Sequence, residues 1–226
     1  MGEAMKRRIL TFHGIGEPER ILDCGEADYW IGLDRFCEIL DRVCCHVNRA
    51  KFLITFDDGN LSDLRLAAPE LCRRGLDAEF FVLTGRLDKT GSLDPDAVRR
   101  LLEMGMRIGT HGIDHRDWSG LSERELEWEL GRSKRQLEEI CGHSVLSASI
   151  PFGRYNRSTL AKLRACGYQT VYSSDGGDAT TGRFLQARTS IRNSMTDAMV
   201  DHILNGHLPA MRRLRRAARL TLRAWV

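Results

Sequence analysis

Two adjacent carboxylates at the end of a strand-like run constrain this chain more than any other feature. Residues 51–56 form an apolar, β-branched and aromatic run of strand length, and Asp57, Asp58 and Gly59 follow directly. Neighbouring like charges raise each other's cost of ionising, so a buried strand that ends in Asp-Asp needs a compensating positive charge. A divalent metal ion is the natural candidate. A simple polar turn is the alternative.

Strand-like and helical patterns alternate about seven times along the chain. Strand-like runs are expected near residues 9–12, 51–56, 78–84, 106–111, 147–150, 170–173 and 185–191. Helical spacing is expected over residues 33–47, 61–74 (kinked or broken at Pro69), 95–105, 122–142, 156–167 and 196–204. This alternation is typical of parallel βαβ units and predicts an α/β fold. If the strands close into a barrel, functional residues are expected in the loops at their carboxyl ends.

A pair of histidines follows the fourth strand-like run. His111 and His115 are four residues apart, a spacing that puts two imidazoles on one face of a helical turn. With Asp58 as a third ligand they would leave one coordination position open, as in catalytic zinc sites. A His-x-x-x-His pattern in a loop is often incidental. Its combination with Asp57 and Asp58 at a neighbouring strand end favours a metal site.

Three short motifs, in order, resemble those of the polysaccharide deacetylase (NodB-homology) family. They are Thr-Phe-Asp-Asp-Gly at residues 55–59, His-x-x-x-His at 111–115 and Pro-Phe-Gly at 151–153. The resemblance runs from about residue 10 to about residue 195. It implies a distorted (β/α)7 barrel and metal-dependent removal of N-acetyl, sometimes O-acetyl, groups from sugars.

The resemblance also implies roles for individual residues. By position, Asp58, His111 and His115 would hold one divalent metal ion, with zinc expected, and Asp57 would be the general base towards a metal-activated water. In the third motif, Pro151, Phe152 and Gly153 would form the oxyanion and substrate-binding turn, with the main-chain N–H of Phe152 as the donor.

Two departures from the family pattern bear on the mechanism. Many members carry an arginine two residues before the proline of the third motif, where it hydrogen-bonds the catalytic aspartate. Ser149 stands there, so Asp57 is predicted to lack that partner. The family's late catalytic histidine has no clear counterpart. The general acid is therefore left open between His13, which ends the first strand, and His207.

The last residues differ from the rest of the chain in charge. Residues 212–226 hold six arginines and no acid, so the net charge of +3 leaves +3 − 6 = −3 for everything before them. Apolar residues spaced three and four apart predict a basic amphipathic helix over residues 211–226, after a catalytic domain of residues 1–210. That helix could lie on an anionic membrane surface or pack onto the barrel. No motif supports a nucleic-acid partner.

The N-terminus shows no signal-peptide pattern, and no run approaches the roughly 18 apolar residues of a membrane span. Seven cysteines without a C-x-x-C pair indicate reduced thiols and a cytoplasmic or membrane-peripheral location. The sequence thus predicts a metal-dependent hydrolase, acting on a non-peptide carbon–nitrogen bond, that deacetylates an N-acetylated sugar, a polysaccharide or its precursor. The alternatives are a catalytically inactive carbohydrate-binding barrel and a hydrolase of a non-carbohydrate amide.

Overall fold

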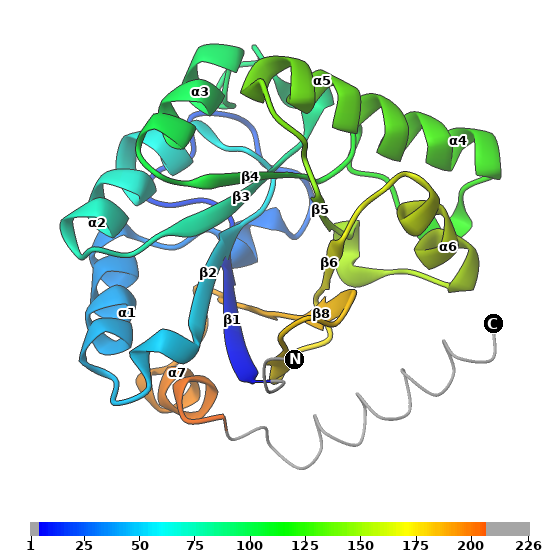
Figure 1. Cartoon of the computed structure of the whole chain (residues 1–226). Coiled ribbons are helices and arrows are strands. Elements are labelled where there is room, and N and C mark those ends of the chain that lie inside the picture. Colours follow the sequence, from blue (N-terminus) through cyan, green and yellow to red (C-terminus); the bar gives the residue numbers. More distant parts are fainter. Residues whose placement is uncertain (1–4, 207–226) are drawn as a thin grey trace.

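A computed structural model describes residues 5–206 of the chain. Its parallel strands are β1 (Lys6–Phe12), β2 (Phe52–Phe56), β3 (Ala78–Val82), β4 (Arg107–Thr110), β5 (Ser147–Ser149), β6 (Thr170–Ser173), β8 (Leu185–Ala187) and β9 (Thr189–Ser190). The helices are α1 (Leu33–Cys45), α2 (Ala68–Arg73), α3 (Pro95–Glu103), α4 (Glu123–Glu127), α5 (Ser133–Cys141), α6 (Arg157–Ala165) and α7 (Asp197–Leu204). Figure 1 shows the helices arranged around the outside of the strands.

The strands form a nearly closed barrel. Strands β1 to β6 pair in sequence order, and β8 pairs with β6. The short strand β9 pairs with β1 on the other side, and β7 (Ala179–Thr180) adds an antiparallel pairing to the start of β1. The α/β fold predicted from the alternating pattern and the distorted (β/α)7 barrel implied by the family resemblance are both confirmed.

The closing segment differs from the prediction of one strand over residues 185–191. It consists of two short strands with Arg188 between them. The N–H of Arg188 still bonds to the carbonyl of Ser173 on β6, and its own carbonyl accepts from the N–H of Gly176. Within this segment β8 pairs with β6 on one side and β9 pairs with β1 on the other.

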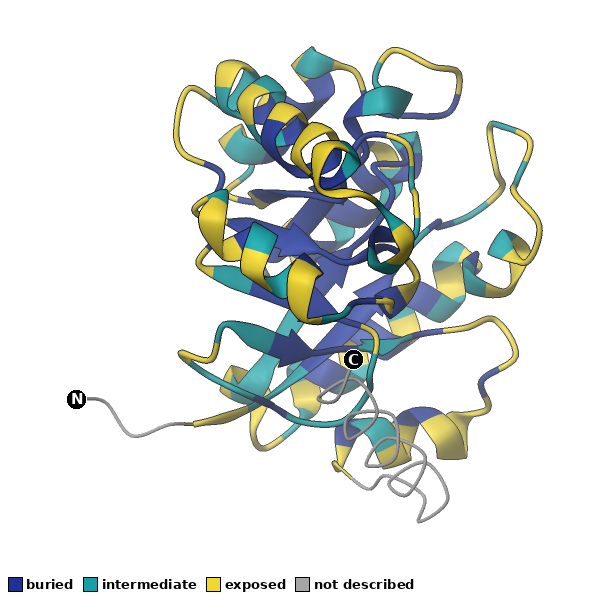
Figure 2. Ribbon diagram, turned by 90° about the vertical axis from the view of Figure 1, so that its right-hand side faces the viewer, coloured by how far each residue is buried: buried dark blue, intermediate teal, exposed yellow. Residues whose placement is uncertain are grey.

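Side chains alternate between the barrel interior and the helical shell, as the pleat of a strand requires. Phe56 packs outward between Phe12 and Phe80, with ring centroids 5.5 and 4.6 Å away. Thr55 points the opposite way and bonds Thr11 on the neighbouring strand β1, Oγ1 to Oγ1 at 3.0 Å. Figure 2 shows the resulting pattern, with buried strands and helices exposed only on their outer faces. Because Asp57 continues the face of Thr55, it is directed into the barrel.

Two helices contain a π-helical segment. The helix predicted to kink or break at Pro69 instead runs through it, and the wider turn η3 (Asp63–Ala67) directly precedes α2. Proline has no N–H to donate to the preceding turn, and the π turn accommodates that loss without ending the helix. A second segment, η6 (Trp128–Arg132), joins α4 to α5. Both segments carry a buried acid, Asp63 and Glu129.

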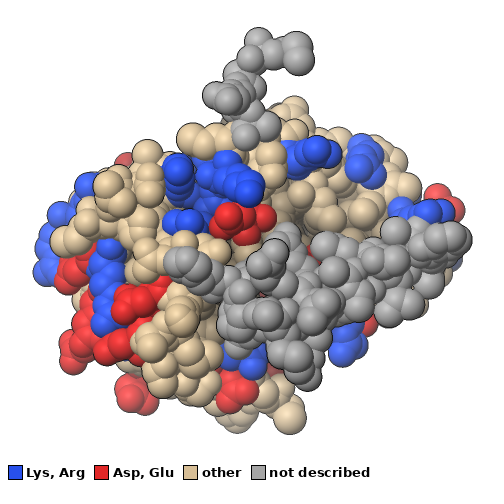
Figure 3. All heavy atoms as spheres, turned by 90° about the horizontal axis from the view of Figure 1, so that it is seen from below, with Lys and Arg blue, Asp and Glu red and all other residues tan. Residues whose placement is uncertain are grey.

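The outer surface of the described part carries charges of both signs. On the face shown in Figure 3, lysine and arginine side chains lie beside aspartate and glutamate side chains. Arg8 and Asp178 form one such ion pair near the start of β1, at 3.4 Å. Among residues 5–206, no helix combines the length and apolar character needed to cross a bilayer. His207, the domain boundary at residue 210 and the predicted helix over 211–226 lie outside the described residues, so they stay predictions.

Candidate metal centre

The first part of the site stands at the end of β2, in the middle of the sheet. Asp57 and Asp58 follow directly, and the N–H of Asp57 still bonds to the carbonyl of Phe12 on β1, at 3.0 Å. At Asp58 the backbone takes a left-handed conformation (φ 81°), and Gly59 repeats it (φ 70°). Both carboxylates are buried. The sharp turn therefore gives the two neighbouring acids different directions.

The second part is the loop that follows β4. The N–H of His111 bonds to the carbonyl of Val82 on β3 at 2.9 Å, which extends the ladder by one residue. The chain then turns through Gly112 (φ 90°) and reaches His115, itself left-handed (φ 53°). The carboxylate of Glu129 accepts a hydrogen bond from the N–H of Ile113, at 2.7 Å. The loop is thus shaped by the main chain and by an acid from η6.

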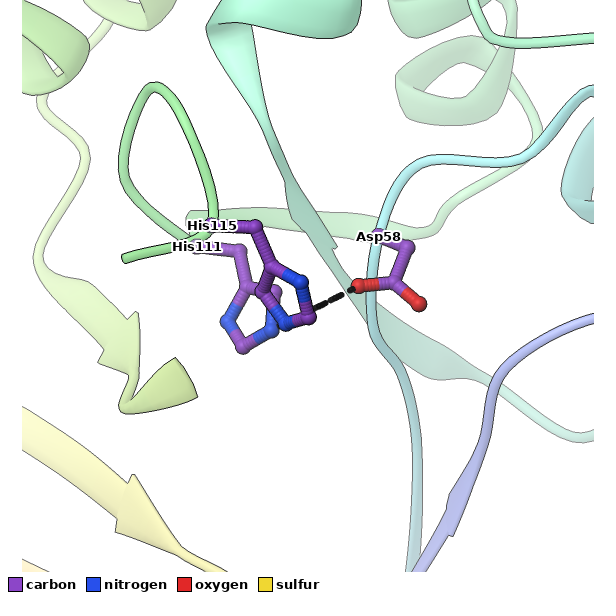
Figure 4. A group of neighbouring side chains, drawn as sticks. All are labelled: Asp58, His111 and His115. Atoms are coloured by element: carbon purple, nitrogen blue, oxygen red, sulfur yellow. Dashed lines mark ion pairs between the residues drawn. The ribbon is translucent and has the colours of Figure 1, made fainter. Parts of the chain in front are cut away.

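The structure brings three of the predicted site residues together as possible ligands. Oδ1 of Asp58 lies 3.6 Å from Nε2 of His111 and 3.7 Å from Nε2 of His115, and their donor atoms all lie within 4.8 Å of one another. Figure 4 shows both imidazoles facing the carboxylate. A tetrahedral ion with bonds of 2.0–2.2 Å separates its ligands by roughly 3.4 Å. The three residues therefore fit a divalent cation.

Two further observations agree with that fit. Oδ1 of Asp58 is buried and has no hydrogen-bond partner, which is costly unless a cation takes that place. Nδ1 of His111 lies 2.8 Å from the carbonyl of Ser149, which fixes its proton on Nδ1 and leaves the lone pair of Nε2 towards the site. Sequence reasoning did not identify this partner, because a main-chain carbonyl carries no sequence signal.

The electrostatics keep two of the candidate ligands, His111 and Asp58, in their binding forms. Burial lowers the pKa of His111 to about 4, so its ring is neutral near pH 7. Burial alone would raise the pKa of Asp58, but the nearby imidazoles of His13 and His115 bring it below its usual value. Neutral imidazoles and an ionised carboxylate are the forms that bind a cation.

The arginine that the family places two residues before the motif's proline is absent, as Ser149 indicates, and an arginine from elsewhere in the chain takes its place beside Asp57. Arg188, which is 0% exposed, donates from Nη1 to Oδ1 of Asp57 at 2.8 Å and from Nη2 to Oδ2 at 2.7 Å. Ser149 adds a bond from Oγ to Oδ2 of Asp57, at 3.0 Å. The guanidinium sits over the rings of Phe81 and Tyr172, at 5.2 and 5.5 Å. Burial would raise the pKa of Asp57, but the charge of Arg188 outweighs it and holds that pKa below its usual value.

The remaining predicted residues line the same pocket or its edge. His13 follows β1, and its ring centroid lies 4.8 Å from that of Tyr29. Phe152 is 58% exposed, and its ring lies 4.4 Å from that of His115. Pro151 and Gly153 on either side of Phe152 are buried.

Backbone strain concentrates at this site. Among the described residues, four other than glycine have positive φ, and three of them are Asp58, His115 and Phe152 (φ 81°, 53° and 57°). Such conformations cost on the order of 1–3 kcal/mol each and persist where the surroundings enforce them. The pocket around these residues has a volume of about 670 Å³ and is walled on one side by residues 23–29. A space of this size can admit a sugar unit.

Comparison with known proteins gives the family. The model of the polysaccharide deacetylase family matches residues 46–171. YxkH of Bacillus subtilis, named for the same family, is 29% identical over 142 residues, which are 63% of this chain and 51% of that protein. A chitooligosaccharide deacetylase of Azorhizobium caulinodans is 28% identical over 125 residues, 55% of this chain and 58% of that protein. The chain thus spans about half the length of the curated relatives it matches.

Solved structures show the same fold. The Streptococcus pyogenes deacetylase PplD, solved with acetate, superposes with a TM-score of 0.77 at 21% identity, covering 92% of this chain and all of that one (100%). The polysaccharide deacetylase BA0330 of Bacillus anthracis gives 0.75 at 20% identity, covering 91% and 70%. With the family model matching more than half of the sequence, the chain belongs to the polysaccharide deacetylase family of hydrolases, as its three motifs predicted.

Proposed function

We propose that this protein removes the acetyl group from an N-acetylated sugar, with a divalent cation held by Asp58, His111 and His115. One observation carries the proposal. A second carboxylate, Asp57, stands beside the three ligands, with Oδ2 4.0 Å from Nε2 of His111, and it is engaged by Arg188 instead of joining the ligand set. A cation that activates water beside a separately held base is one arrangement that can hydrolyse an amide.

The donor set favours zinc. Two imidazoles and one carboxylate, with one position open, make a typical catalytic zinc site. When bound, such an ion lowers the pKa of water towards about 7 and polarises a carbonyl oxygen. The neutral ring of His111 and the ionised carboxylate of Asp58 are ready to bind it near pH 7.

Asp57 acts as the general base. Its carboxylate is fixed by two bonds from Arg188 and one from Ser149, so its orientation does not depend on the substrate. It takes the proton of the water that attacks the acetyl carbonyl. Because its pKa lies below the usual value, it is ionised throughout the neutral range and is in the form that can accept a proton.

The turn after β5 binds the developing oxyanion. Phe152 takes a left-handed conformation between two buried residues, Pro151 and Gly153. The N–H of Gly153 is already bonded to the carbonyl of Ile150, at 3.0 Å. In this arrangement the N–H of Phe152 is the donor assigned to the acetyl oxygen.

His13 is the group we assign to the leaving amine. It lies in the pocket, close enough to both carboxylates for its charge to act on their pKa values. Its Nδ1 is buried without a hydrogen-bond partner, and its ring rests against Tyr29. A protonated His13 can deliver its proton to the amine nitrogen as the carbon–nitrogen bond breaks.

The substrate class follows from the relatives. Those with curated names include a chitooligosaccharide deacetylase and peptidoglycan N-acetylglucosamine deacetylases of Listeria monocytogenes and Bacillus cereus. These names support an N-acetylglucosamine-type sugar as the substrate here, as a polymer or as its precursor.

Acetate release from N-acetylglucosamine oligomers tests the proposal. The purified protein should release acetate, lose the activity after treatment with a chelator and regain it when zinc is added back. Asp57→Asn should bind the oligomers but release little acetate. If the wild-type protein with zinc binds the oligomers and releases none, it is a carbohydrate-binding barrel. If it releases acetate only from other amides, the sugar assignment is wrong.

A further inference from the structure

The metal-binding loop is held in shape by a carboxylate that none of the three motifs contains. Glu129 comes from the π-helical segment η6 and is 0% exposed. Its Oε2 accepts a hydrogen bond from the N–H of Ile113 at 2.7 Å and from that of Asp114 at 3.3 Å. These two residues lie between His111 and His115. Glu129 thus binds the middle of the loop whose two ends carry the imidazoles.

The loop fits around this carboxylate without spare room. A Cβ on Gly112 would lie 2.6 Å from Oε2 of Glu129 and 3.1 Å from Cζ2 of Trp118. Gly112 also has φ 90°, a conformation that residues with side chains rarely adopt. Both the space and the backbone therefore require glycine at this position.

The other main-chain groups of the loop are bonded as well. Oγ1 of Thr110 accepts from the N–H of Gly112 at 3.0 Å. The carbonyls of Gly112 and Ile113 accept from the N–H groups of Thr84 and Gly85, at 3.0 and 3.1 Å. Within this network, Glu129 is the one ionisable side chain that bonds the loop's main chain.

The π turn puts Glu129 in position. The segment also carries Leu130 inward. Ser133, the residue after the segment, donates its hydroxyl to the carbonyl of Glu129 and accepts a hydrogen bond from Oγ1 of Thr110, at 2.9 Å. A π turn rotates the residues that follow it relative to an α-helix, and such turns occur often at functional sites. The irregular segment of the helix is thus also the part that contacts the loop through Glu129.

We propose that Glu129 is a positioning residue for the metal centre: by binding the N–H groups of Ile113 and Asp114, it holds the loop in the strained conformation that brings His111 and His115 to one ion. The inference rests on the metal site of the proposed function but not on its chemistry. Partners of this kind are typically worth 10- to 100-fold in metal affinity.

The test is zinc affinity of the full chain, measured by chelator competition, in Glu129→Leu and Glu129→Gln. Leucine removes both acceptors, so we expect zinc to bind 10- to 100-fold more weakly. Glutamine keeps one acceptor oxygen of similar shape, so the loss should be under about tenfold. Glu139→Gln is the matched control, because Glu139 is an exposed acid on α5, which continues directly from η6. It should bind zinc as the wild type does.

Hydrogen exchange in the zinc-free protein gives a second readout that needs neither metal nor substrate. The amides of Ile113 and Asp114 should be protected in the wild type and exchange faster in both Glu129 variants, more so in Glu129→Leu. If Glu129→Leu does not fold, Glu129→Gln carries the test alone. Zinc affinity and exchange unchanged in a folded Glu129 variant would overturn the proposal. A wild type that binds zinc but releases no acetate would contradict the proposed function and leave this inference standing.

Discussion

The two halves of the metal centre are held in different ways. On the aspartate side, Asp57 and Asp58 follow a central strand, and the side chain of Asp57 is held by partners from distant parts of the chain, Arg188 above all. On the histidine side, His111 and His115 belong to a loop whose main chain is bound by Glu129. The comparison teaches that one half positions charges through side chains, whereas the other positions imidazoles through the backbone.

Each half also has a π-helical segment with a buried acid, and the two acids differ. Glu129 of η6 accepts two main-chain hydrogen bonds. Asp63 of η3 is buried near Asp58, and burial together with that neighbouring charge raises its pKa well above the usual value. The first acid supports the site, whereas the second imposes a cost on the fold. The variants below test this division.

The largest effect is expected from the aspartate pair itself. Asp57→Asn should lower kcat by about 10²- to 10⁴-fold, because the base is lost, while zinc affinity stays within a few-fold. Asp58→Asn should instead weaken zinc binding by orders of magnitude, because the anionic ligand is lost. Kinetics beside zinc titration of both variants separate the two roles. Equal loss of zinc in both would mean that Asp57 is also a ligand.

Replacing Arg188 should come next in size. Arg188→Met leaves Asp57 buried without its cation, which typically costs about 3–5 kcal/mol of unfolding free energy. In the protein that remains folded, kcat should fall about 10²-fold with KM little changed, because the base is no longer oriented. Arg188→Lys supplies one ammonium in place of a two-pronged guanidinium, so its kcat should lie between that of the wild type and that of Arg188→Met. A KM effect without a kcat effect in both variants would place Arg188 outside the positioning of the base.

The pH dependence of the zinc-free protein tests the histidine side. The pKa of His111 falls from 6.5 to about 4 on folding, so the unfolded chain binds more protons between those values. The contribution of this ring to stability is therefore complete above pH 6.5 and is lost as the pH falls towards 4. The slope should reach at most about 1.4 kcal/mol per pH unit. Chemical unfolding at several pH values should show it, and His111→Gln should flatten it.

The smallest effect is expected at Asp63. Its folded pKa is raised, so the folded state keeps a proton that the unfolded chain loses, and stability falls as the pH rises above the ordinary aspartate range. Asp63→Asn removes this cost and should raise the unfolding free energy by about 1 kcal/mol or more at pH 8, with no gain at pH 4. Thermal unfolding at the two pH values measures the difference. A destabilised variant at pH 8 would assign Asp63 a supporting role like that of Glu129.

The sequence could predict those parts of the site that are marked by short local motifs. The Asp57–Asp58 pair and the two histidines are each local motifs at strand ends, and a parallel barrel gathers strand ends at one rim, so the grouping of Asp58 with His111 and His115 was predictable. Arg188 stands 131 residues from Asp57 in the chain, in the gap between two short strands, where no pattern marks it. Ser149 showed only that the family's arginine is missing from its usual position, not which residue replaces it.

Glu129 was missed for a related reason. It falls inside the helix predicted over residues 122–142, within the π-helical segment that joins α4 to α5. Helical periodicity reveals neither a π turn nor the contact of one helical side chain with a distant loop. Partners that act through tertiary contact therefore escaped prediction on both sides of the site.

The most direct test of the central claim is a crystal structure of the zinc-loaded protein with anomalous data at the zinc edge. The account predicts one ion bound by Asp58, His111 and His115 at about 2.0–2.2 Å, with Asp57 outside its coordination and still bonded to Arg188. An ion bound elsewhere, or Asp57 turned from Arg188 to become a ligand, would contradict it.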